Sequence, residues 1–130
     1  MSRDKHQLVD YFTHILQAIE RIERYTAGIE QATFLANEMI QDAVIRNLEI
    51  IGEASHNIEG RYPEFAAAHP DLPLASASQM RNVVSHGYFK VDLRIVWKTI
   101  ESELPRLREK VQRTLESLPA EISVQGKGQG

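Results

Sequence analysis

One short segment of the chain concentrates side chains that suit chemistry on a phosphate ester. Residues 80–92 read MRNVVSHGYFKVD, which places an arginine, a histidine and a tyrosine within a few positions. The guanidinium of Arg81 is permanently charged and fork-shaped, so it can hold a phosphate and stabilise extra negative charge in the transition state. A histidine side chain, with a usual pKa of about 6.5, can take the proton from a ribose 2′-hydroxyl or give one to the leaving oxygen. Arg81 and His86 therefore suit RNA cleavage without a metal ion, with a 2′,3′-cyclic phosphate as the product.

The spacing of these two residues makes a second copy of the chain part of this hypothesis. Arg81 and His86 are five positions apart, which on an ideal helix means about 140° around the axis and about 7.5 Å along it. They would not share a face of that helix. Gly87 is well suited to end the helix, and a tightened or unwound last turn lets the guanidinium approach the imidazole. A cleft between two copies would gather two arginines and two histidines around one phosphate, so we expect a homodimer.

The same residues also fit a structural role, and spacing alone leaves both interpretations open. A histidine followed by glycine is a common helix ending, Arg81 can pair with a carboxylate such as Glu53, and Tyr88 can pack with Phe89. No glycine-rich phosphate loop, nucleophile elbow or His/Glu pair at metal-ligand spacing occurs in the sequence. The other histidines are scattered singly, so we predict neither a metal site nor a cofactor; they are His6, His14, His56 and His69.

Composition favours one globular domain in a reducing compartment. The chain has 130 residues, 42% of them hydrophobic and 25% charged, which is ordinary for a single globular domain. Cysteine is absent and the first residues carry no apolar signal segment, so we expect a cytoplasmic protein without a membrane span. The formal net charge of −3 argues against a general RNA-coating role, because contact with RNA then needs a local basic patch or a partner.

Apolar residues recur at spacings of three and four, which predicts an all-α fold. We expect helices over about 4–25, from about 33 or 37 to 58, over about 75–86, and from Asp92 onward, with a turn-rich connector over 62–74. Gly28 should end the first helix, and Asp92 should cap the last one, which Pro105 should kink. The charged residues on the first helix predict a solvated face; they are Glu20, Arg21, Glu23 and Arg24.

The sequence thus predicts an up-and-down bundle of four to five helices. We place a single domain at residues 1–118 and a flexible C-terminal tail at 119–130, where Pro119 and the run GKGQG change the composition.

The spacing of Arg81, His86 and Tyr88 resembles the RxxxxHxY signature of HepT toxins, which are members of the HEPN superfamily. Three further segments are similar to that family, in the same order along the chain: ERIERYTAG at 20–28, DAVIRNLEIIGEA at 42–54 and VDLRIVWKTIESELPRLR at 91–108. The resemblance covers residues 4–118. Leu74 and Gln79 depart from the family, whose members commonly have tryptophan and glycine there.

The resemblance implies a dimerising HEPN-like bundle in which the two motifs face one cleft, and a metal-independent endoribonuclease with Arg81 and His86 as catalytic residues. It also implies a type VII-like toxin–antitoxin pair. In such a pair a minimal nucleotidyltransferase antitoxin, MntA, neutralises the toxin by transferring AMP to the motif tyrosine, here Tyr88. Asn82 and Glu53 are supporting candidates, although Asn82 fits a surface position equally well. The alternative is a non-catalytic HEPN subunit that binds the nucleotidyltransferase.

Overall fold

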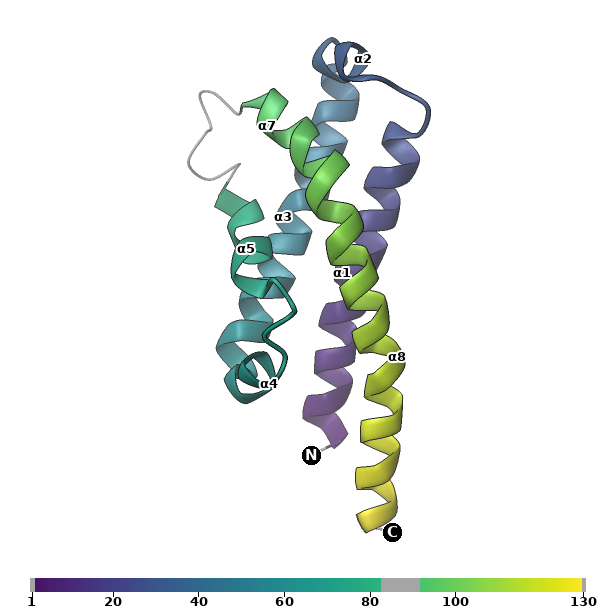
Figure 1. Cartoon of the computed structure of the whole chain (residues 1–130), viewed down its shortest axis with the longest axis vertical. Coiled ribbons are helices and arrows are strands. Elements are labelled where there is room, and N and C mark those ends of the chain that lie inside the picture. The colour runs from purple at the N-terminus through teal and green to yellow at the C-terminus, as the bar shows by residue number, and fades with distance from the viewer. Residues whose placement is uncertain (1, 83–91, 130) are drawn as a thin grey trace.

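The structure is a computed structural model that describes residues 2–82 and 92–129, with side chains for 6–82 and 92–118. Every element in these ranges is a helix, which confirms the all-α prediction. The three long helices are α1 (Ser2–Thr26), α3 (Glu38–Arg61) and α8 (Leu104–Gln129). α1 packs against both α3 and α8, and the chain runs up through α1, down α3 and finally down α8 (Figure 1). The up-and-down arrangement is therefore confirmed within one chain.

Short helices connect the long ones. They are α2 (Gln31–Leu35), α4 (Pro63–Ala68), α5 (Leu74–Ser78), the 3₁₀ helix η1 (Gln79–Arg81), α7 (Leu93–Lys98) and the π-helix η2 (Thr99–Glu103). α5 and η1 both pack on α3, and α7 packs on α2. In the connector expected over 62–74, α4 forms a short helical piece, and Leu74 at its end is the first residue of α5.

The helix predicted over about 75–86 is wrong in one respect, because its described part changes type. The α-helix ends at Ser78, and the next turn, through Arg81, is a 3₁₀ helix. Leu74, Ala77 and Met80 are the buried residues of this stretch and are spaced by three. A 3₁₀ helix has three residues per turn, so the tighter winding keeps Ala77 and Met80 on one side.

Several helix ends follow from local sequence, as predicted. Gly28 has a φ of +74° directly after α1, a conformation that glycine adopts without steric cost. Asp92 accepts hydrogen bonds from the backbone N–H groups of Arg94 and Ile95, so it caps α7. Asn37 caps α3 in the same way, because its side-chain oxygen accepts from the N–H of Ile40 at 2.9 Å. Asn37 thus marks the later of the two predicted starts for this helix.

Pro105, which is predicted to kink the last helix, follows closely on a π-helical turn. η2 ends at Glu103, and Pro105 is the second residue of α8. A proline ring clashes with the carbonyl four residues earlier in a regular helix, and a wider π turn relieves that crowding. Beyond this turn the backbone of α8 stays helical to Gln129. The boundary at 118 and the flexible tail at 119–130 stay predictions.

The core lies between the long helices. Its largest fully buried side chains come from all three of them and from the short helices α2 and α7; they are Phe12, Ile15, Ile19, Ile22, Phe34, Val44, Leu48, Ile51, Ile58, Val96, Leu104 and Leu107. The rings of Phe34 and Trp97 lie 5.3 Å apart and join α2 to α7.

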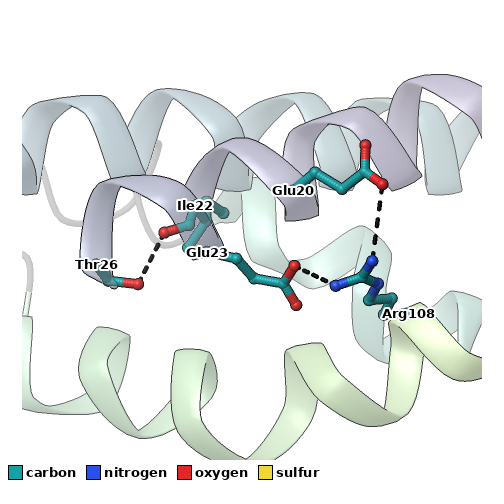
Figure 2. Close-up of polar contacts among 5 residues, drawn as sticks. All are labelled: Glu20, Ile22, Glu23, Thr26 and Arg108. Atoms are coloured by element: carbon teal, nitrogen blue, oxygen red, sulfur yellow. Dashed lines mark hydrogen bonds and ion pairs between the residues drawn. The ribbon is translucent and has the colours of Figure 1, made fainter. Parts of the chain in front are cut away.

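Part of the charged face of α1 is not simply solvated, contrary to expectation. Arg108 of α8 forms ion pairs with both Glu23 and Glu20 of α1, the latter at 3.8 Å (Figure 2). Glu20 and Glu23 are three positions apart and therefore lie on one side of α1, and the arginine of the neighbouring helix bridges them. One turn later, the hydroxyl of Thr26 donates to the carbonyl of Ile22 at 2.7 Å, also drawn in Figure 2.

Candidate active site

Arg81 lies at the end of η1, where buried neighbours fix its backbone. Met80, the preceding residue, is only 6% exposed and packs in the core. Consecutive residues of a 3₁₀ helix are turned by about 120°, so burial of Met80 directs Arg81 elsewhere. The Arg81 side chain is 34% exposed, which leaves its guanidinium within reach of a ligand from solvent. The fold therefore presents a permanent cation from a well-anchored turn.

A glycine of α3 allows η1 to come this close. A Cβ atom added at Gly52 would lie 2.5 Å from the backbone nitrogen of Arg81 and 2.7 Å from its Cβ. Glycine inside a helix costs about 1 kcal/mol relative to alanine, so the close approach accounts for its presence. Gly52 is not among the residues singled out from the sequence, although an isolated glycine within a helical pattern is a signal of close packing or of function.

The next residue of α3 pairs with the guanidinium. Oε1 of Glu53 lies 3.5 Å from Nη1 of Arg81, so the structure brings together two of the residues singled out from the sequence. Glu53 is 60% exposed, and an ion pair this open to solvent contributes no more than about 1 kcal/mol. Glu53 thus orients Arg81. Because this ion pair is weak, a phosphate can displace Glu53 from the guanidinium at little cost in free energy.

Of the other residues singled out from the sequence, the structure describes Asn82 but not His86 or Tyr88. Asn82 is half-buried directly after η1, and its backbone N–H donates to the carbonyl of Gln79. His86 and Tyr88 belong to 83–91 and lie outside the described residues, so their positions relative to Arg81 stay predictions. The described chain resumes at Asp92, the cap of α7.

Glu53 also borders a groove between α1 and α3. The groove has a volume of about 260 Å³, and its walls carry both acidic and basic groups; they include Tyr11, His14, Arg46, Glu49, Glu53 and Asn57. Within the described ranges, no three histidine or acidic side chains gather closely enough to hold a metal ion. None of the helices described is long and apolar enough to cross a membrane.

Comparison with known proteins shows which family this chain is similar to. A family model described as "Ribonuclease HepT-like" matches residues 15–114, a range that contains α3, η1 and the whole motif. The chain is 43% identical over 104 residues to the "Probable ribonuclease HepT" of Thermococcus cleftensis, and the match covers 80% of this chain and 92% of that protein.

Two further relatives are candidate RNases by name. One, from Caldanaerobacter subterraneus, is 37% identical over 106 residues, which is 82% of this chain and 92% of that protein. The other, from Methanocaldococcus jannaschii, is 32% identical over 108 residues, covering 83% of this chain and 96% of that protein. No solved structure matches the chain significantly.

Proposed function

Because the chain belongs to the HepT-like ribonuclease family, we propose that it is a metal-independent endoribonuclease and the toxin of a toxin–antitoxin pair. The observation that carries the proposal is the setting of Arg81. This cation is anchored by η1, pressed against Gly52 and oriented by Glu53, yet remains one-third exposed. Such a group can hold a phosphate in a fixed position, which is the main demand that phosphoryl-transfer chemistry makes of a protein.

The proposed reaction uses the RNA's own nucleophile. A ribose 2′-oxygen attacks the adjacent phosphorus and loses its proton to a base, while the bond to the 5′-oxygen of the next nucleotide breaks and that oxygen gains a proton. The products are a 2′,3′-cyclic phosphate and a 5′-hydroxyl. His86 supplies the proton transfer, and Arg81 stabilises the charge that builds on the phosphoryl oxygens. In this mechanism Glu53 is a positioning residue and Asn82 a supporting one.

The catalytic test compares the wild-type protein with His86→Ala and Arg81→Ala in the presence of a chelator. We expect wild-type protein to produce fragments with cyclic phosphate ends, identified by mass spectrometry, and both variants to lose this activity. Cleavage that survives His86→Ala would remove His86 from the mechanism. Growth arrest on expression of the wild-type chain alone supports a toxin, whereas harmless expression favours a non-catalytic binding subunit.

We further propose that the active unit is a homodimer with one shared cleft, because residues five positions apart, such as Arg81 and His86, would lie on different faces of an ideal helix. Mixing inactive Arg81→Ala protein with inactive His86→Ala protein tests this. If each site draws on both copies, mixed dimers contain one intact pair and regain part of the activity. No recovery despite proven subunit exchange, or a fully active monomer, contradicts the shared cleft.

Regulation by a nucleotidyltransferase antitoxin forms the last part of the proposal. The phenolic oxygen of Tyr88 would attack the α-phosphorus of ATP, releasing pyrophosphate and the phenolic proton and leaving AMP on the tyrosine. The added phosphate would repel RNA and block its access to Arg81. Intact-mass measurement with ATP and the neighbouring nucleotidyltransferase should show AMP additions that Tyr88→Phe removes. Unmodified wild-type protein would refute this mechanism.

A further inference from the structure

A second groove lies beside η1, between α5 and the start of α8. It has a volume of about 190 Å³, and its walls include Ser76, Met80, Glu103, Arg106, Leu107 and Lys110. Met80 directly precedes Arg81, so one short helix, η1, both lines this groove and carries the proposed catalytic arginine, whose side chain turns toward Glu53 of α3. The groove is separate from the one that Glu53 borders, which lies between α1 and α3.

The groove carries a positive local charge on an acidic chain. Arg106 and Lys110 are spaced by four on α8, and neither forms an ion pair with any residue in the described part of the chain. Arg108 and Arg113 of the same helix are, by contrast, each paired with glutamate. Among the described residues, Glu103 is the one carboxylate on the groove wall, which leaves two cations against one anion. Because the net charge of the chain is −3, a polyanion can be attracted to it only at a local positive patch such as this one.

The volume of the groove suits part of a polynucleotide better than a whole cofactor. Its volume is below the range of about 300–1,000 Å³ that is usual for small-molecule sites.

The half-buried ring of Pro73 and the exposed edge of Met80 supply apolar surface for a base, while the hydroxyl of Ser76 and the carboxylate of Glu103 can bind ribose hydroxyls or base amino groups. The π turn η2 contributes Glu103 and immediately precedes the turn that carries Arg106, and such turns are frequent at functional sites.

We propose that this groove is an RNA subsite, in which Arg106 and Lys110 bind the phosphate of a nucleotide that flanks the one cleaved beside Arg81. The inference rests on the proposed ribonuclease activity and adds the path of the substrate strand. RNA is favoured over an acidic protein segment because η1, whose Met80 lines the groove, also carries Arg81, the residue proposed to hold the scissile phosphate. The subsite would act in substrate binding and leave the chemical step unchanged.

The experiment measures binding of a single-stranded 2′-O-methyl RNA oligonucleotide, which lacks the attacking hydroxyl and is not cleaved. Fluorescence anisotropy over a range of salt concentrations compares wild-type protein with Arg106→Ala/Lys110→Ala. The matched control is Arg24→Ala/Arg113→Ala, which removes the same charge from exposed positions outside the groove. We expect the groove variant to bind roughly tenfold more weakly at low salt, with a salt dependence shallower by about 0.7 for each cation lost.

Cleavage of ordinary RNA provides the second readout. The groove variant should show a raised KM with kcat within about twofold of wild type, and the charge-conserving variant Arg106→Lys/Lys110→Arg should restore most of the affinity. Circular dichroism establishes that each variant is folded. An unchanged salt dependence in the groove variant, with RNA still bound and cleaved, overturns the subsite but not the ribonuclease; an acidic protein partner for the groove would give this result. Wild-type protein that neither binds nor cleaves RNA overturns both proposals.

Discussion

Replacing Gly52 with alanine tests whether the close contact between α3 and η1 positions Arg81. The new Cβ would lie 2.5 Å from the backbone nitrogen of Arg81, whereas ordinary contact begins at 3.4 Å. The obstructing atoms are the backbone N and Cα of Arg81 and its Cβ, whose position the backbone fixes, so none can swing aside as the end of a flexible side chain would. η1 must therefore move by most of an ångström relative to α3.

Two opposing terms set the change in stability. Forcing a methyl group into a packed contact costs about 1–3 kcal/mol, while replacing glycine by alanine inside a helix stabilises it by about 1 kcal/mol. We expect Gly52→Ala to lower the free energy of unfolding by up to about 2 kcal/mol. Activity should fall further, because a catalytic group displaced by about 1 Å loses on the order of a hundredfold in rate.

The assay combines thermal unfolding with the kcat for RNA cleavage, measured at a temperature at which the variant is folded. Gly60→Ala is the matched control, because Gly60 lies in the same helix and a Cβ there meets nothing within 4 Å. The control should be as active as wild type and equally or slightly more stable. If Gly52→Ala behaves like Gly60→Ala in both measurements, the contact does not constrain Arg81 and the reasoning is wrong.

Three other predictions concern stability and are checked by chemical denaturation. Asn37→Ala removes the cap of α3 and should cost about 1 kcal/mol, whereas an unchanged midpoint would show that the cap contributes nothing. Ser55→Ala should stabilise the protein by roughly 1 kcal/mol, because the buried hydroxyl has no hydrogen-bond partner in the described residues; destabilisation would mean that it has one. Arg108→Met breaks the ion pairs with Glu20 and Glu23 and should cost at most about 1 kcal/mol, since Arg108 is 35% exposed. That loss should shrink in high salt, and a loss insensitive to salt would contradict the electrostatic explanation.

Features of the fold that depend on neighbouring residues could be predicted from the sequence. The long helices follow from apolar spacing, the end of α1 from Gly28, and the start of α7 from Asp92, because each depends on residues within one or two turns. Arg81 and Glu53 could be proposed as a pair because their charges are opposite, but nothing local places residues 28 positions apart in contact.

The helical class and the types of residue in the site therefore follow from the amino-acid sequence alone, since periodicity and residue type are local properties. How these residues are positioned depends on the packing of the helices. The 3₁₀ turn at Arg81 reflects burial of Met80 on one side and the backbone contact with Gly52 on the other. The groove that joins Ser76 to Lys110 likewise exists only because α5 packs on α3 while α8 packs on α1. Such contacts depend on which helices meet, and helical periodicity does not specify the partner.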